Sequence, residues 1–338
     1  MLTEQKLQAL LALTNDRSQP NIGPLWAIAK DLEAIRLNLK FFGYDLARTL
    51  AEALPVRTDL QPAPIGLTSK ACTQEDLESD WAAAWCAELK VPVAFHRKLW
   101  EFAFVLQALF EHGKLAEGAR GVGFGCGEEP IASYLASRGC QILLTDLPPL
   151  DRKAAGWAEG GQHCSALESA FFPDLVAEDV FRRNVALEYV DMTAIPDTLR
   201  DFDFCWSICA LEHLGSIQAG LTFIERSMDT LQSGGVAVHT TEFNYLNDDE
   251  TIDNWATVLY QRRHFRALQE RLSAKGHKVL PLDFNIGAKP MDRFIDLPPY
   301  LHDWKEPMRR EWAANLNHLK LTVDGFACTC FGLIVVKS

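Results

Sequence analysis

The chain of 338 residues has no excess of basic residues and no long apolar run. It carries 33 lysines and arginines against 45 aspartates and glutamates, a formal net charge of -12. Nucleic acids and anionic membranes bind positively charged surfaces, so we expect neither to be a general partner. No apolar stretch approaches the roughly 20 residues that span a bilayer, and the N-terminus shows no secretory signal.

Diagnostic metal and nucleophile motifs are also missing. Nine cysteines without a secretory signal predict reduced thiols and a cytoplasmic location. Cys328 and Cys330 are too tightly spaced for a usual zinc hairpin, and they alternate along a predicted strand. The chain has no P-loop and no recognisable Ser-His-Asp arrangement. We therefore expect no metal site.

Residues 1–115 are predicted to form a helical N-terminal region. Apolar residues from Leu25 to Leu46 recur in alternating steps of three and four, which is the a/d pattern of a helix that packs on another surface. That surface is either the protein's own core or the same helix in a homodimer. A Pro-rich stretch at residues 55–71 predicts a linker, and a further helix is expected from Val93 to His112. The region would act as a lid over a site or simply support it.

Residues 116–338 change to short apolar strands that alternate with helices, which predicts an α/β fold with a parallel, doubly wound sheet. The expected strands are residues 121–124, a strand that ends at Asp146, and residues 185–190, 202–208, 236–240, 278–284 and 326–336. Insertions are expected near residues 148–184 and 285–320.

The stretch from Gly121 to Pro130, followed by Gln141 to Asp146, reads as a strand, a glycine turn, a helix and a strand that ends on an acid. Glycines at such a turn let a ligand approach the backbone, and the acid can bind a pair of ribose hydroxyls. NAD does not fit, because a G-x-G-x-x-G frame begun at residue 121, 123 or 125 meets a non-glycine at its end. Glu128 and Glu129 would also repel a pyrophosphate, whereas a cationic ligand tolerates them.

This pattern resembles motif I of the class I S-adenosylmethionine (SAM) methyltransferases. Gly125 and Gly127 match the paired glycines of that family, and Asp146 matches its ribose-binding acid. The resemblance implies a Rossmann-like, seven-stranded sheet with an antiparallel closing strand, and SAM as cofactor. The chain departs from the family at Gly123, where an acid is usual, and at Glu129, where a third glycine is common. The contact to the cofactor's amino group is therefore expected to differ.

Ligands of an open α/β sheet lie beyond the carboxyl ends of its strands. With the resemblance, this rule predicts a cofactor site of Phe124, Gly125, Cys126, Gly127, Asp146, Leu147, Asp191, Met192, Ser207 and Ile208. On the acceptor side, the candidates for a base or an acceptor ligand are Glu212, His213, His239 and Glu242. His213 could instead be a locally bonded helix-start residue. A metal site from the two histidines and Glu242 is conceivable by residue type only.

We therefore predict SAM-dependent methyl transfer to a small-molecule or sugar-like acceptor. One alternative is an enzyme of the same fold that uses SAM otherwise, by cyclisation of its aminobutyrate chain with release of methylthioadenosine. A second alternative is an inactive SAM-binding scaffold that dimerises through the stripe from Leu25 to Leu46.

Overall fold

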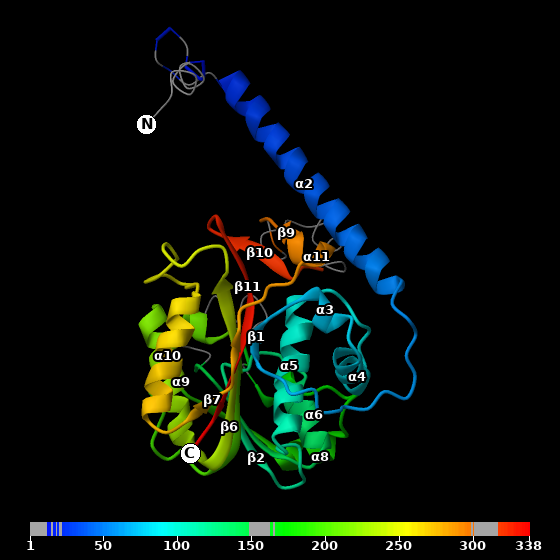
Figure 1. Cartoon of the computed structure of the whole chain (residues 1–338), viewed down its shortest axis with the longest axis vertical. Helices are drawn as coiled ribbons and strands as arrows, with labels where there is room; N and C mark the ends of the chain where they lie inside the picture. The colour runs from blue at the N-terminus through cyan, green and yellow to red at the C-terminus, as the bar shows by residue number, and fades with distance from the viewer. Residues whose placement is uncertain are drawn as a thin grey trace.

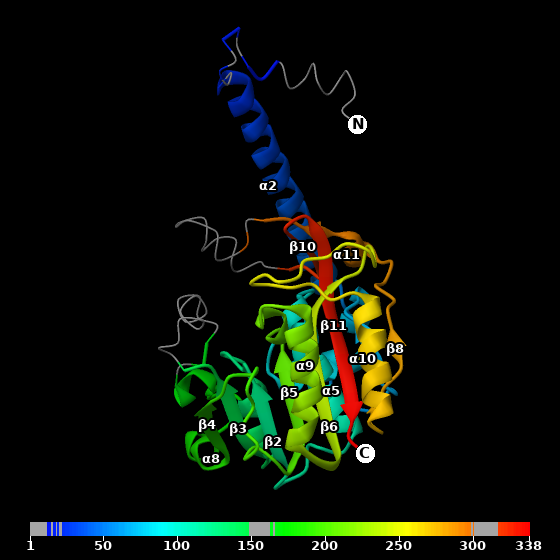
Figure 2. The same ribbon diagram turned by 90° about the vertical axis from the view of Figure 1, so that its left-hand side faces the viewer.

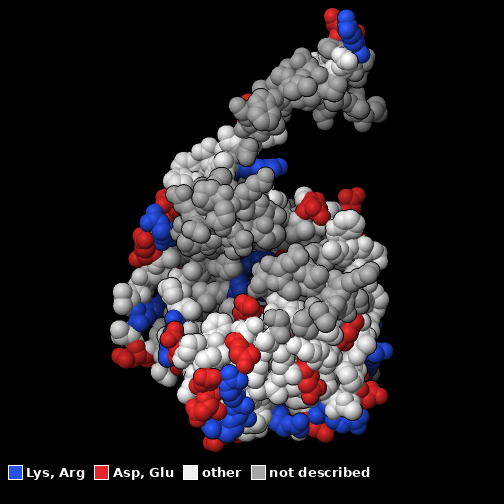
Figure 3. Space-filling view, turned by 180° about the vertical axis from the view of Figure 1, so that it is seen from behind, with Lys and Arg blue, Asp and Glu red and all other residues white. Residues whose placement is uncertain are grey.

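The computed structural model describes residues 12–14, 16–17, 19, 22–148, 163–164, 166–298, 300 and 317–338, with backbone only for residues 22–30 and 33. Much of each predicted insertion, at residues 149–162 and 301–316, lies outside the described residues. Within the described part, no helix is both long enough and apolar enough to cross a membrane. On the face shown in Figure 3, the described acidic and basic side chains lie close to one another.

A twisted sheet forms the centre of the molecule (Figures 1 and 2). Its main strands, from one edge, are β4 (Val185–Tyr189), β3 (Gln141–Asp146), β2 (Arg120–Phe124), β5 (Phe202–Ile208), β6 (Leu231–Asn244) and β11 (Phe326–Val336). The first five are parallel, and β11 runs antiparallel to β6. The predicted doubly wound α/β fold with an antiparallel closing strand is therefore confirmed.

The sheet is larger than expected, with eleven strands among the described residues where seven were predicted. The additional short strands are β1 (Ser69–Ala71), β7 (Lys278–Val279), β8 (Leu282–Asp283), β9 (Ile295–Asp296) and β10 (Lys320–Val323). The predicted sixth strand is divided in two: β7 pairs with β11, whereas β1 lies between β11 and β8. A strand from the N-terminal region thus belongs to the main sheet.

Helices cover both faces of the sheet (Figure 1). On one face lie α4 (Asp80–Glu88), α5 (Arg97–Glu111), α6 (Ile131–Ser137) and α8 (Glu178–Asn184); on the other lie α9 (Ile217–Ser227) and α10 (Arg262–Ala274). Shorter pieces are α3 (Gln74–Leu77), α11 (Pro290–Arg293), and the 3-10 turns η1 (Leu167–Ala170), η2 (Leu211–His213) and η3 (Met228–Thr230). Strand residues alternate between the faces, so Trp206 and Val238 join the core under α5 while Cys205 and Ala237 join the core under α9.

The long helix α2 (Ile22–Glu52) projects from one end of the molecule (Figures 1 and 2). It contains the predicted helix and continues through Gly43, where a Cβ would lie 2.1 Å from the ring of Phe294. Close packing explains why glycine stands there. The base of α2 is held by Asp296, which accepts hydrogen bonds of 2.7 Å from Lys40 Nζ and from the Tyr44 hydroxyl.

The N-terminal helices α4 and α5 pack directly against the body of the protein. Helix α5 contacts β5, β6 and β11. The indole of Trp100 donates to Asp76 (2.9 Å), and the indole of Trp85 donates to Gln107 (2.6 Å). His96 accepts a hydrogen bond from the backbone N–H of Lys98 (3.3 Å) and so caps α5. This cap places the first turn of α5 over the carboxyl ends of β5 and β6.

Candidate cofactor and acceptor site

The glycine turn joins β2 to α6 and touches the ends of two other strands. Gly125 and Gly127 have φ angles of +60° and +53°, in the left-handed region that favours glycine. A Cβ on Gly125 would lie 2.7 Å from the Cβ of Ala210, just after β5, and 3.1 Å from the Sδ of Met192, just after β4. The turn therefore lies directly against these strand ends, and a side chain at position 125 would separate them.

Asp146, the last residue of β3, is bonded to this turn. Its Oδ2 accepts from the backbone N–H of Gly127 (3.3 Å) and of Cys164 (2.9 Å), and its Oδ1 accepts from that of Leu147 (2.8 Å). The Nε2 of His163 lies 3.6 Å from Oδ1. The structure thus brings the predicted glycine turn and the predicted ribose acid together, with the carboxylate oriented by backbone donors.

Three other predicted cofactor residues, Phe124, Ile208 and Asp191, lie at the same edge. The ring of Phe124 packs on Phe223 of α9, with centroids 5.4 Å apart. Ile208 is buried in the core under α5. Asp191 Oδ1 accepts hydrogen bonds from the backbone and the hydroxyl of Thr193, at 2.8 and 2.7 Å, and so closes the turn after β4.

Gly123 leaves no room for the acid that the resembled family carries at this position. A Cβ there would lie 2.3 Å from the Sγ of Cys126 and 2.4 Å from the indole of Trp206. Both neighbours are buried. The departure from the family's pattern therefore has a packing cause, because Trp206 and Cys126 fill the space that an acidic side chain would need.

Glu129 supplies an acid nearby. Its Oε2 is buried and has no hydrogen-bond partner among the described residues. Burial raises the pKa of Glu129 well above its usual range; Lys98 counteracts this, whereas Glu101 and Asp146 add to it. An unpaired acid beside a glycine turn fits a ligand that carries positive charge, as the ammonium and sulfonium groups of SAM do. The turn, Asp146 and Glu129 together therefore fit this cofactor.

His239 lies on the opposite face of β6 from the acidic candidates. Its Nδ1 is 2.8 Å from the hydroxyl of Ser207, its Nε2 is 3.1 Å from that of Ser227, and its ring meets Phe223. Burial lowers the pKa of His239 to about 3. Both ring nitrogens are occupied and the residue is 1% exposed. This environment argues against the predicted role of His239 as a base, and Ser207 faces His239 rather than a ligand.

His213, in η2, makes local contacts. Its Nδ1 lies 3.0 Å from the carbonyl oxygen of Ala256 and 3.2 Å from the hydroxyl of Thr257. Burial lowers the pKa of His213. These contacts match the local-bonding alternative for this residue, and they orient its ring toward the loop before α10. The structure does not bring His213 and His239 together.

Glu212 and Glu242 do lie together, at the ends of η2 and β6. With Cys209 they offer three ligand atoms within 4.8 Å of one another. Glu242 Oε1 accepts a hydrogen bond from Arg97, and Glu212 Oε2 accepts one from the Thr241 hydroxyl (2.9 Å). The other oxygens, Glu242 Oε2 and Glu212 Oε1, are buried and have no hydrogen-bond partner among the described residues. Burial, and then the charge of Glu242, raise the pKa of Glu212 to about 8.

Residues of α5 complete this cluster, and their arrangement was not predicted. Arg97 pairs with Glu242 and lies 3.4 Å from the Sγ of Cys330. Glu101 is fully buried and accepts from the Thr240 hydroxyl (2.5 Å) and from Cys330 (3.0 Å). The sequence signal that could have pointed to Glu101 is an acid within an otherwise apolar segment of the predicted helix. Glu101, Cys209 and Cys330 form a second group with metal-ligating atoms close together.

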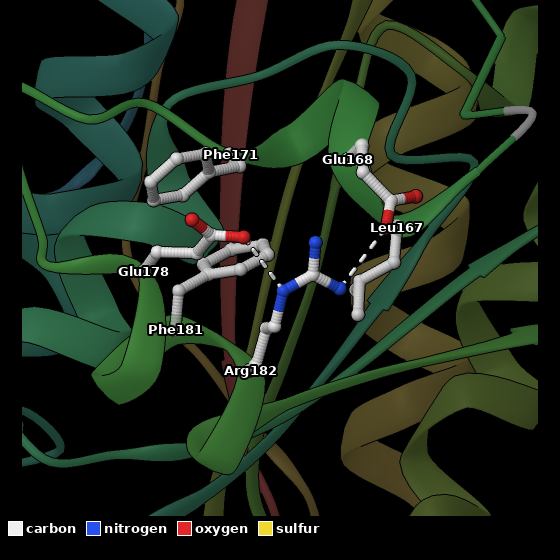
Figure 4. A pocket seen from close by; sticks show the side chains of 6 residues that line it. All are labelled: Leu167, Glu168, Phe171, Glu178, Phe181 and Arg182. Carbon is white, nitrogen blue, oxygen red and sulfur yellow. Dashed lines mark hydrogen bonds and ion pairs between the residues drawn. The ribbon is translucent and has the colours of Figure 1, made fainter.

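A shallow pocket between η1 and α8 lies apart from these candidates (Figure 4). Arg182 crosses it, with hydrogen bonds to Glu168 (3.0 Å) and Glu178 (2.9 Å). Leu167, Phe171 and Phe181 complete its lining. Its polar groups are already paired with one another, so this pocket offers no chemistry of its own.

No family model matches the chain, and no curated protein matches it. Solved structures do match, several of them SAM-dependent methyltransferases. The magnesium protoporphyrin IX methyltransferase of Synechocystis PCC 6803, with bound SAM, is 11% identical with a TM-score of 0.40, and the match covers 71% of this chain and 79% of that one. The 4+2 cyclase SpnF is 16% identical with a TM-score of 0.44, over 80% of this chain and 99% of that one. The phosphoethanolamine N-methyltransferase 2 of Haemonchus contortus is 14% identical with a TM-score of 0.41, over 69% and 52%. Any functional proposal therefore rests on the site itself.

Proposed function

We propose that this protein transfers a methyl group from SAM to a small-molecule or sugar-like acceptor. The observation that carries the proposal is the left-handed glycine turn whose Gly127 N–H is bonded to Asp146, with the unpaired acid Glu129 beside it. A turn of this kind lets a nucleoside approach the backbone closely, and an acid at the end of the next strand binds its ribose hydroxyls.

Each part of the site has a distinct task in this proposal. Bound SAM supplies an activated methyl group. Gly125 and Gly127 admit the cofactor, Asp146 binds its ribose, and Glu129 pairs with its ammonium group. On the acceptor side, Glu212 and Glu242 orient the acceptor and take up the proton that it loses. General-base assistance of this kind is typically worth about 10²–10⁴-fold in rate.

Cyclisation of the cofactor's own aminobutyrate chain is the second candidate function. It is favoured by Gly123, because Trp206 and Cys126 exclude the usual acid and so alter the contact to the amino group. The two functions differ in their products. Transfer leaves S-adenosylhomocysteine, whereas cyclisation releases methylthioadenosine.

Thermal unfolding with candidate cofactors tests the cofactor assignment first. A ligand that binds only the native state stabilises it, so SAM and S-adenosylhomocysteine should raise the Tm and NADH should not. Equal shifts with SAM and NADH, or no shift with any of the three compounds, would refute SAM as cofactor. Product analysis after incubation with SAM, with and without candidate acceptors, then separates the functions. Cyclisation releases methylthioadenosine without any acceptor, whereas transfer gives S-adenosylhomocysteine only when an acceptor is present. Cofactor binding without product across all acceptors would favour an inactive scaffold.

A further inference from the structure

We propose that Glu212 and Glu242 form a site for the ammonium group of the acceptor, so that the substrate is an amine. This inference rests on the proposed function, since it assigns the substrate class of the same site. It follows from three features of the two acids: their unpaired oxygens, the charge balance around them, and their position beside the glycine turn.

The unpaired oxygens are the first feature. Glu212 is 0% exposed and Glu242 is 4% exposed, and each has one carboxylate oxygen without a hydrogen-bond partner among the described residues. Leaving a buried charged acceptor unsatisfied is costly. An ammonium group carries several N–H donors and a positive charge, so one group can satisfy both oxygens.

The charge balance is the second feature. Glu101, Glu212, Glu242 and Asp146 are buried around the strand ends, and Glu129 is partly exposed with a buried Oε2, whereas the facing cations are Arg97 and Lys98. Acids are therefore in excess. Burial and the neighbouring acids raise the pKa values of Glu129 and Glu212, because concentrating negative charge here costs free energy. A bound ammonium group would offset that cost.

The position of the pair is the third feature. Ala210 touches the glycine turn, since its Cβ would lie 2.7 Å from a Cβ on Gly125, and Glu212 follows two residues later. The acids thus flank the proposed cofactor site at the carboxyl edge, where acceptors bind in open α/β sheets. An ammonium nitrogen must lose a proton before it can react. In the bound complex that proton passes from the nitrogen to the carboxylate of Glu212.

A divalent metal ion would compete for the same acids, with Cys209 as a third ligand. Two observations favour the ammonium group. The guanidinium of Arg97 bonds Glu242 and lies 4.0 Å from the Sγ of Cys209, so a divalent ion would face a fixed positive charge. Burial also raises the pKa of the Cys209 thiol, which opposes formation of the thiolate that metals prefer.

Matched ligand pairs test the inference by calorimetry. Methylammonium, ethanolammonium and benzylammonium are each compared with the neutral alcohol of the same skeleton, and the protein is titrated with and without saturating S-adenosylhomocysteine. We expect at least one ammonium ligand to bind about 10- to 100-fold more tightly than its alcohol, the effect of charged hydrogen bonds. Repeating the titration near pH 7 in buffers of different ionisation enthalpy should reveal release of about one proton.

Amide variants locate the site. Glu212→Gln keeps the shape of the protonated acid and is expected to fold; both it and Glu242→Gln should lose the preference for ammonium over alcohol. Glu270→Gln, a change at an exposed acid on α10, should keep it. The inference is overturned if no ammonium ligand exceeds its alcohol with or without S-adenosylhomocysteine. It is also overturned if Zn²⁺ alone binds stoichiometrically and is lost in Cys209→Ala. Ammonium preference without S-adenosylhomocysteine binding would refute only the proposed function.

Discussion

The acid at position 212 is expected to make stability depend on pH. Its pKa is raised from 4.5 to about 8, and the titratable groups facing it are Glu242, Glu101, Cys209 and Tyr260. Between these two pKa values the native state binds a proton that the unfolded state has lost. The free energy of unfolding should therefore fall as the pH rises from about 5 to 8, by on the order of 3 kcal/mol.

Urea unfolding of the wild type and of Glu212→Gln at both ends of this range measures the contribution of this residue. The variant has no proton to lose there, so its stability relative to the wild type should increase with pH. Parallel pH dependence in the two proteins would show that Glu212 is already ionised at neutral pH.

Asp146 is expected to contribute directly to cofactor binding. Replacing it by alanine removes a charged acceptor beside the glycine turn and should weaken S-adenosylhomocysteine binding by roughly 1–3 kcal/mol. Calorimetric titration gives the affinity. Because Asp146 also binds the backbone of Gly127 and Cys164, Tm must be followed in the same variant. An unchanged affinity would mean that the ribose is bound elsewhere.

The structure brings the predicted acids Glu212 and Glu242 close together, whereas it buries the predicted base His239 on the other face of β6. Residues along a strand alternate between its two faces, and Val236 and Val238 share the face of Glu242. His239 therefore belongs to the other face, under α9. Alternation alone could have revealed this. The pairing of Glu242 with Arg97 could not be predicted, because it depends on where α5 crosses a sheet that is distant in sequence.

At the scale of elements, α2 depends on a buried ion pair for its attachment. Lys40 and Asp296 have side chains that are 1% and 0% exposed. Lys40→Ala removes this cation, although the buried carboxylate keeps its contacts to Tyr44 and His318. It should therefore destabilise the protein by roughly 1–3 kcal/mol, the effect of losing a hydrogen bond to a charged group. Arg48→Ala is the matched control, because its pairs with Asp45 and Glu52 are exposed and such pairs contribute little. Chemical denaturation compares the two, and equal losses would contradict the assigned anchor.

Helix α5 bears on whether the N-terminal region is a lid. Its first turn supplies Arg97 and Lys98 to the site, whereas Trp100 and Phe104 are buried against the sheet. We propose that cofactor binding orders this first turn. Hydrogen exchange of residues 80–115, with and without S-adenosylhomocysteine, measures the effect. Added protection of the glycine turn alone would identify the helices as support only.

Most major strands were predictable because they contain short apolar runs, as buried parallel strands usually do. β5 and β11 begin and end where the sequence indicated. β1 was missed because three residues in a Pro-rich stretch carry no periodic signal. Its pairing with β11 is a long-range contact. Because β1 lies between β11 and β8, the second half of the predicted sixth strand does not pair with β11.

At the scale of the whole molecule, α2 presents apolar residues away from the body. Ile35 and Phe42 are 62% and 66% exposed, and Leu32, Leu39 and Leu46 continue the same stripe. We propose that this stripe pairs with its counterpart in a second copy, as an a/d pattern suits. Light scattering after size exclusion should give a dimer for the wild type and a monomer for Ile35→Glu/Phe42→Glu. A monomeric wild type would refute the pairing.

The N-terminal and cofactor-binding regions share one core, although the sequence suggested a division near residue 115. Tyr44, Trp85 and Trp100 belong to the same cluster of buried residues as Trp206 and Val238. Because buried contacts and the β1 pairing both cross the proposed boundary, removing the N-terminal region would expose the α5 face of the sheet.

The position of β1 also determines when the protein can fold during synthesis. Lys70 pairs with Gly332, about 260 residues later in the chain. The N-terminal helices leave the ribosome long before β11 has been synthesised. Until then, β1 stays unpaired and the apolar side of α5 stays exposed. Non-local pairing of this kind slows folding and lengthens the time during which apolar surface is open to aggregation. The yield of folded protein should therefore depend on the supply of chaperones, although the core of the native state is extensive.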